Sequence, residues 1–329
     1  MNGVLIIDKP AGLTSHDVVN RARRILHERS IGHLGTLDPM ATGVLPLVTG
    51  NLTRLAQFYI ASEKTYEGTI RFGFATDTYD AEGEPSTAPQ QVILRAEEVE
   101  DLAARFRGVI EQTPPPFSAK KIKGVPAYKL ARQQKEVVLK PVQVEIKEFE
   151  ILAVEVDRAR FRARVASGTY MRSVAHDMGR ELACGAHLES LRRTSVAEFT
   201  LHDAHTLDEL ANHRHPDRSF PFPEGKGSGV EGPWVGEATV ASASDLEALF
   251  IHPRKLLPDL PSVTADEPTI ARIRSGRTVN LPELSRARQV KVFYGQRDLI
   301  AIATRVAGTL FHPKIVLAAE PAKQLARNT

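Results

Sequence analysis

Cysteine is nearly absent from this chain of 329 residues, in which Cys184 is the single example. One cysteine cannot form a disulfide within the chain, and it cannot supply the ligands of a cysteine-based zinc site. No apolar run approaches the roughly 18 residues that a membrane-spanning helix needs. The first residues show neither the basic region nor the cleavage site of a secretory signal. These absences favour a cytoplasmic protein without a membrane segment.

Motifs for common cofactors are also missing. The sequence contains no G-x-x-x-x-G-K-[ST] phosphate loop, no G-x-G-x-x-G dinucleotide fingerprint and no G-x-S-x-G nucleophile elbow. Histidines gather at His202, His205, His213 and His215, but their spacing follows no regular metal-ligand pattern. We therefore expect no cofactor and no metal.

The composition is that of a globular protein, with 42% hydrophobic and 25% charged residues. The length fits two domains of about 150 residues each. A net charge of +3 at pH 7 permits a nucleic-acid partner but does not require one. The distribution of the basic residues is therefore more informative than their sum.

Side-chain patterns predict a mixture of strands and helices. Residues 64–74 alternate between apolar and polar side chains, which predicts a half-buried strand. A threonine followed three residues later by an acid is the spacing of a capping box, and it predicts helix starts at Thr14, Thr206 and Thr264. Residues 219–244 are rich in proline, glycine and serine, which predicts a flexible insertion.

One segment combines basic and aromatic residues without any acid. Residues 112–135 contain six lysines and arginines, with Phe117 and Tyr128 among them. Basic side chains neutralise phosphates and aromatic rings stack on unpaired bases, so this combination suits a loop that grips nucleic acid. A solvated, mobile insertion is an equally good interpretation of this segment alone.

The candidate reactive acid is Asp38, within the glycine- and proline-punctuated loop 32–46. Pro39 biases Asp38 toward an extended backbone, and most neighbouring side chains are apolar. Such a carboxylate could act as a nucleophile or a base, although an Asp-Pro pair alone more often starts a turn. Three further acids lack calcium-loop spacing and are interpreted as turn residues: Asp77, Asp80 and Glu82.

Five stretches resemble, in order and spacing, one enzyme family, the TruB-type tRNA pseudouridine synthases. These stretches are Lys9-Pro10-Ala11-Gly12-Leu13-Thr14-Ser15, the loop from Gly32 to Pro46, Glu63-Lys64-Thr65-Tyr66, Gly168-Thr169-Tyr170-Met171-Arg172 and Leu191-Arg192-Arg193. The match around Asp38 is long and therefore specific. The resemblance covers roughly the whole chain, although the C-terminal part resembles the PUA module of the family only loosely.

The resemblance implies a role for five residues. Asp38 corresponds to the catalytic aspartate, and Arg172 to the arginine that pairs with it. Tyr66 corresponds to the tyrosine that stacks on the flipped uracil and assists proton removal. Leu191 corresponds to an apolar residue that lines the uracil pocket, and His33 to a histidine that contacts the tRNA loop. A cation beside Asp38 is expected to lower the pKa of its carboxyl and to keep it ionised.

The family fold is α+β, with a mixed, largely antiparallel sheet, flanking helices and a central cleft. By resemblance, residues 1–258 form the catalytic domain, residues 259–320 a small β-rich, PUA-like RNA-binding domain, and residues 321–329 a tail. The basic segment 112–135 corresponds to a thumb insertion that closes on the T-loop. Its expected RNA-binding residues are Lys120, Lys121, Lys123, Tyr128 and Lys129.

The implied activity is isomerisation of the uridine at tRNA position 55, in the T-loop, to pseudouridine. It proceeds by base flipping and depends on an aspartate but on no cofactor. Asp38 could add to C6, attack C1′ or abstract a sugar proton, and the sequence leaves these alternatives open. The expected partner is the T-stem-loop of tRNA, bound by a monomer with no obligatory protein partner. Two rival hypotheses are a non-catalytic RNA-binding or chaperone protein and a pseudouridine synthase with another RNA target.

Overall fold

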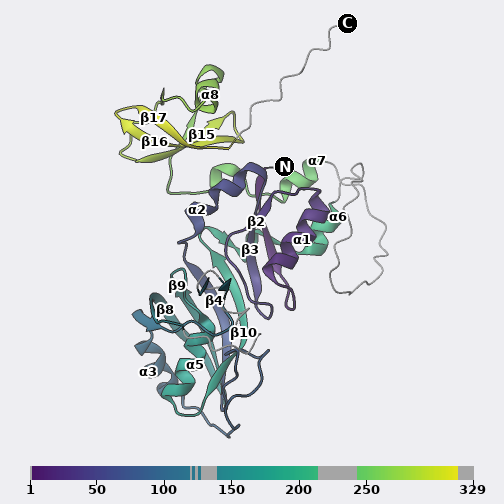
Figure 1. Cartoon of the computed structure of the whole chain (residues 1–329), viewed down its shortest axis with the longest axis vertical. Helices are drawn as coiled ribbons and strands as arrows, with labels where there is room; N and C mark the ends of the chain where they lie inside the picture. The colour runs from purple at the N-terminus through teal and green to yellow at the C-terminus, as the bar shows by residue number, and fades with distance from the viewer. Residues whose placement is uncertain (1, 119–120, 123–124, 127–138, 214–242, 318–329) are drawn as a thin grey trace.

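The computed structural model describes residues 2–118, 121–122, 125–126, 139–213 and 243–317 (Figure 1). The predicted insertion at 219–244 therefore lies almost entirely outside the described residues, and the predicted tail at 321–329 lies wholly outside them. Among the described residues, no helix is long and apolar enough to cross a membrane.

The strands of the first and larger sheet come from most of the chain. They are β1 (Gly3–Lys9), β2 (Ile31–His33), β3 (Thr42–Thr49), β4 (Lys64–Phe72), β5 (Gly108–Gln112), β8 (Val142–Glu155), β9 (Arg158–Val165), β10 (Ala186–Val196), β11 (Phe199–Thr200) and β12 (Ala204–His205). A short hairpin is formed by β6 (Lys121–Ile122) and β7 (Val125–Pro126).

The strands of the larger sheet follow the order β12-β1-β3-β10-β4-β9-β8-β5, with β2 beside β3 and β11 beside β10. In this sheet the β1–β12 and β3–β10 pairs are parallel, and the other described pairs are antiparallel. The predicted mixed, largely antiparallel sheet is therefore confirmed. The parallel β3–β10 pair joins the strand that follows the Asp38 loop to the strand that carries Leu191.

The helices and the 3-10 turns lie between strands along the whole described chain. They are α1 (Ser15–Leu26), η1 (Gly50–Leu55), α2 (Ala56–Tyr59), α3 (Ala96–Arg105), α5 (Met171–Glu181), η2 (Leu201–Asp203), α6 (Leu207–Asn212), α7 (Ala243–Ala248), η3 (Pro253–Lys255) and α8 (Glu267–Arg274). The predicted capping boxes at Thr14 and Thr206 are both confirmed, and they start α1 and α6.

One face of the larger sheet forms the main hydrophobic core. Helices α1, α3, α5 and α6 pack their apolar sides on this face, where the sheet contributes residues such as Ile70 and Phe161. Figure 1 shows α1 and α6 together over one half of the sheet and α3 and α5 over the other. Leu37, the neighbour of Asp38, belongs to the same core. The main core therefore supports the base of the Asp38 loop.

The C-terminal residues form a separate small sheet that packs on the opposite face of the larger one. Its strands are β13 (Ser262–Thr264), β14 (Val279–Asn280), β15 (Gln289–Tyr294), β16 (Asp298–Ala307) and β17 (Leu310–Val316), in the order β13-β15-β16-β17-β14. A second apolar cluster joins Phe293 and Ile302 of this sheet to Val4 and Val44 of the larger sheet. The expected β-rich C-terminal part is therefore present.

The prediction that Thr264 caps α8 is wrong. Thr264 ends β13, where its backbone pairs with Phe293 of β15. The N-cap is Asp266, whose carboxylate accepts a hydrogen bond from the backbone N–H of Thr269 at 3.1 Å. A polar side chain two residues later therefore makes the capping contact, because strand pairing already fixes Thr264.

Candidate active site

Asp38 lies in the loop that joins β2 to β3. Several polar contacts fix the backbone of this loop. The hydroxyl of Ser15, at the start of α1, donates to the carbonyl of Leu37 at 3.1 Å and accepts from its N–H at 2.8 Å. The ammonium of Lys9 donates to the carbonyl of Pro39 at 3.1 Å. The residues on either side of Asp38 are thus tied to α1 and to β1.

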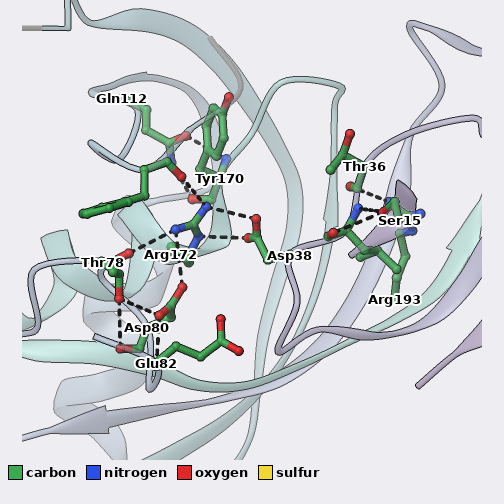
Figure 2. A network of polar contacts seen from close by, with 12 residues as sticks. Ser15, Thr36, Asp38, Thr78, Asp80, Glu82, Gln112, Tyr170, Arg172 and Arg193 are labelled. Atoms are coloured by element: carbon green, nitrogen blue, oxygen red, sulfur yellow. Dashed lines mark hydrogen bonds and ion pairs between the residues drawn. The ribbon is translucent and has the colours of Figure 1, made fainter. Parts of the chain in front are cut away.

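Arg172, in the first turn of α5, makes a two-point contact with the Asp38 carboxylate (Figure 2). Its Nη2 donates to Oδ1 at 3.0 Å, and its Nε lies 2.9 Å from Oδ2. The Arg172 side chain is 6% exposed, whereas 35% of the Asp38 side chain is exposed. The arginine is therefore a buried support, and the carboxylate it holds remains open on one side. The predicted Asp38–Arg172 pair is present.

The same guanidinium also holds a second carboxylate, which belongs to Asp80. Nη1 of Arg172 lies 3.3 Å from Oδ2 of Asp80, whose side chain is 4% exposed. The hydroxyl of Thr78 and the N–H of Glu82 donate to Oδ1 of Asp80 at 2.6 and 3.1 Å. The carbonyl of Thr78 accepts from Nη1 of Arg172 at 3.1 Å. Figure 2 shows these residues converging on the arginine.

The interpretation of Asp80 as only a turn residue is therefore incomplete. Asp80 does lie in a tight turn, but it is buried and paired with the proposed catalytic arginine. A sequence signal for this role is hard to find, because Asp80 and Arg172 are far apart in the chain. The available hint is that a carboxylate rarely becomes fully buried without a charged partner.

Arg172 lowers the pKa of Asp38, as expected, but it does not set the net direction of the shift. The pKa of the Asp38 carboxyl is raised above its ordinary value, first because the surrounding protein removes water from it. Arg172 opposes this change, but the charge of Asp80 adds to it. One guanidinium shared by two carboxylates cannot offset both burial and mutual repulsion. Burial and the Asp80 charge also raise the pKa of Glu82.

Tyr66 and Leu191 lie on the two central strands of the sheet. Tyr66 is on β4 and Leu191 on β10, where Leu191 faces Gly68 across the strand pair. Both are buried in the main core, which also contains Leu37 and Met171, the neighbours of Asp38 and Arg172. These two predicted residues therefore share the main core with the chain neighbours of Asp38 and Arg172.

His33 ends β2, opposite Leu47 of β3. Burial lowers the pKa of its imidazole, and the charge of the nearby Arg193 adds to the shift. The strand that His33 ends leads directly into the Asp38 loop. Within the described part of the chain, no hydrogen-bond partner contacts its buried Nδ1.

The segment that leads into the basic insertion is attached to α5. The Gln112 side chain accepts from the N–H of Tyr170 at 2.8 Å and donates to its carbonyl at 3.1 Å. The carbonyl of Phe117 accepts from Nη2 of Arg172 at 3.0 Å. The insertion therefore starts beside the carboxylate pair. Four of its predicted RNA-binding residues lie outside the described residues: Lys120, Lys123, Tyr128 and Lys129. The fifth, Lys121, belongs to β6, but its side chain also lies outside the described part.

A shallow hollow of about 240 Å³ lies over β3, β4, β9 and β10. Its lining includes Glu67 and Arg160, together with Leu191 and with Met40 of the Asp38 loop. Side chains alternate along a strand, so Glu67 points to the face opposite that of Tyr66. Within the described residues, no group of three or more histidine, cysteine or acidic side chains is arranged to hold a metal ion.

Comparisons with known proteins place the chain in a family. The model of the TruB family pseudouridylate synthase N-terminal domain matches residues 23–171, and that of the tRNA pseudouridylate synthase B C-terminal domain matches residues 172–219. The chain is 46% identical to tRNA pseudouridine synthase B of Solibacter usitatus, over 96% of this chain and 100% of that protein. It is 44% identical to tRNA pseudouridine synthase B of Aquifex aeolicus, over 66% of this chain and 76% of that protein.

Solved structures share the fold at lower identity. The chain resembles one in the crystal structure of a Cbf5-Nop10-Gar1 complex, with a TM-score of 0.65 and 23% identity over 96% of this chain and 85% of that one. A chain of the archaeal box H/ACA sRNP Nop10-Cbf5 complex gives a TM-score of 0.64 at 22% identity, over 96% and 86% of the two chains. These structures share the fold, and the family models with the near-full-length Solibacter usitatus relative establish that the chain belongs to the TruB family of pseudouridylate synthases.

Proposed function

We propose that this pseudouridine synthase acts on the T-loop of tRNA and converts the uridine at position 55 to pseudouridine. The observation that carries the proposal is the Asp38 carboxylate, held at two points by a buried arginine and open on one side. The names of the relatives, tRNA pseudouridine synthase B, support tRNA as the substrate. A tRNA-modifying enzyme of this kind works in the cytoplasm.

The reaction breaks the C1′–N1 bond and makes a C1′–C5 bond. The proton on C5 must leave, and N1 must gain one, so no oxidant or reductant is required. A uridine within a folded loop must first leave its stack, at a cost of a few kcal/mol. Stacking on Tyr66 can offset roughly 1–3 kcal/mol of this cost. Leu191, on the neighbouring strand, would contact the base from the apolar side.

In this proposal Asp38 is the group that reacts with the substrate, and Arg172 aims it. The two contacts from the guanidinium fix both oxygens of the carboxylate. Asp80 in turn fixes the guanidinium from the opposite side. Addition to C6, attack on C1′ and removal of a sugar proton all require an ionised Asp38. The raised pKa of this carboxyl therefore predicts that activity falls on acidification at a higher pH than for an ordinary aspartate.

We further propose that RNA binding extends beyond the reaction centre. The basic segment 112–135 would contact the T-stem-loop, and His33 would contact the loop around the extruded base. Residues 259–320 would act as a PUA-like RNA-binding domain beside the catalytic domain 1–258. We propose that a monomer performs these steps without a cofactor and without a protein partner. Light scattering of the protein alone and with tRNA tests the oligomeric state.

The test of the proposed function is tritium release from a tRNA transcript labelled at C5 of its uridines. Release, followed by mapping of pseudouridine to position 55, is the expected result. A transcript with cytidine at position 55 should release none. Binding without release would instead favour a non-catalytic RNA-binding or chaperone protein. Release from the substituted transcript would indicate another RNA target.

A further inference from the structure

Arg193, on β10, is a buried cation to which the proposed function assigns no role. It is 1% exposed, and within the described part of the chain no carboxylate pairs with it. Its three hydrogen-bonding nitrogens donate instead to backbone carbonyls. Nε contacts Val44 at 2.8 Å, Nη1 contacts Thr36 at 3.3 Å, and Nη2 contacts Gly35 at 3.1 Å.

The three acceptors flank the proposed catalytic residue on both sides. Gly35 and Thr36 precede Asp38 in the loop, and Val44 follows it at the start of β3. Arg193 therefore closes the loop across its base. Ser15 holds Leu37 from the side of α1, and Figure 2 shows Ser15, Thr36 and Arg193 together in this network.

An unpaired cation inside a protein is costly unless its donors are satisfied. Arginine suits this position because its planar fork presents donors in several fixed directions, whereas a lysine ammonium is a compact point charge. Two nearby lysines are affected by burial and by the positive charge of Arg193. Burial, with a contribution from Arg193, lowers the pKa of Lys64 to about 8 and that of Lys9 to about 8. The three loop carbonyls therefore supply the contacts that satisfy this buried cation.

The preceding residue on the same strand provides an internal contrast. Arg192 points to the opposite face of the sheet, where its guanidinium forms an ion pair with Asp8 at 2.7 Å. Its side chain is 42% exposed. It also donates to the hydroxyl of Thr42 at 3.3 Å, but within the described residues it contacts no carbonyl between Gly35 and Pro39. Of these two adjacent arginines, only Arg193 donates to the backbone carbonyls of Gly35 and Thr36 in the described structure.

We propose that Arg193 is a positioning residue for the isomerisation, which fixes the loop backbone so that Asp38 meets both Arg172 and the substrate. This inference rests on the proposed role of Asp38. Without the shared donor, the carbonyls of Gly35, Thr36 and Val44 lose their common anchor and the loop can relax. A displacement of about 1 Å at a reacting group can cost about a hundredfold in rate.

The test compares Arg193→Met and Arg193→Lys with the matched control Arg192→Met. Single-turnover tritium release at saturating enzyme reports the chemical step, and filter binding reports the affinity for tRNA. We expect Arg193→Met to lower the single-turnover rate by about ten- to a hundredfold, with an unchanged Kd. Arg193→Lys should retain an intermediate rate, and Arg192→Met should match the wild type.

The pH profile separates positioning from a general loss of structure. If the loop relaxes, Asp38 loses part of its contact with Arg172, so the pKa of its carboxyl rises further. The acidic limb of the single-turnover profile should then move to higher pH in Arg193→Met and stay in place in Arg192→Met. A protein that is only less stable would lose amplitude at an unchanged pH midpoint.

Several results would overturn the inference. One is a rate in Arg193→Met equal to that of Arg192→Met, and another is a loss confined to Kd. A third is an unshifted pH profile combined with a rate loss that follows the folded fraction in thermal melting. If Arg193→Met does not fold, Arg193→Lys is subjected to the same three readouts and decides the question. Full activity in Asp38→Asn would refute the proposed function itself, which is a separate outcome.

Discussion

Replacing Arg172 with lysine tests the electrostatic centre of the site. The guanidinium contacts both oxygens of Asp38 and one oxygen of Asp80, and it donates to the carbonyls of Thr78 and Phe117. A lysine ammonium carries one charge but cannot reproduce this planar set of contacts. Arg172→Lys therefore keeps the charge and removes the two-point grip on Asp38.

The expected magnitude follows from the hydrogen bonds that this substitution removes. One hydrogen bond to a charged group contributes roughly 1.5–3 kcal/mol. Each ~1.4 kcal/mol corresponds to a tenfold change in rate. If the loss of the hydrogen bond from Nη2 to Asp38 is expressed in the transition state, the single-turnover rate should fall roughly 10- to 150-fold. The acidic limb of the pH profile should also move upward, because Asp38 has a weaker counter-charge.

The assay is single-turnover tritium release from labelled tRNA, with Kd measured in parallel. Arg180→Lys is the matched control, because Arg180 lies on the same helix with a side chain that is 70% exposed. It should leave rate and affinity unchanged. An Arg172→Lys rate within about threefold of the wild type, or a loss confined to Kd, would refute the claim that the two-point contact aims Asp38.

Three further results are expected from the same substrate. Asp80→Asn should lower the single-turnover rate by about tenfold, because Arg172 loses its second support. It should also shift the acidic limb of the pH profile to lower pH, because a charge that raises the pKa of Asp38 is removed. An upward shift of this limb would contradict the reasoning. Tyr66→Leu should lower the rate with little change in Kd if the ring stacks on the flipped base, whereas a loss only in thermal stability would assign Tyr66 to the core. EDTA should leave the rate unchanged, and a loss that added metal restores would overturn the cofactor-free proposal.

Local patterns predicted much of the fold. The capping boxes at Thr14 and Thr206 and the strand that carries Tyr66 depend on contacts between residues close in sequence, so the sequence indicates them directly. The cap of α8 was mispredicted because strand pairing, a long-range contact, already fixes Thr264. Neighbouring residues alone do not report that constraint.

The site was predicted less completely, for the same reason. The loop residues around Asp38 already indicated a candidate reactive acid, whereas Arg172 came from a resemblance, and no local signal joins either of them to Asp80. The sign of the pKa shift at Asp38 depends on burial and on a shared arginine, neither of which appears in a motif. Alternation along β10 implies that two adjacent arginines point to opposite faces, but only the folded structure identifies Arg193 as the one beneath the loop.

The most direct test of the whole account is tritium release by Asp38→Asn. Asparagine has nearly the shape of aspartate but can neither ionise nor act as a carboxylate nucleophile or base. We expect no release above the uncatalysed background, with Kd for tRNA within about twofold of the wild type. Substantial release by this variant would contradict the assignment of Asp38 as the reacting group.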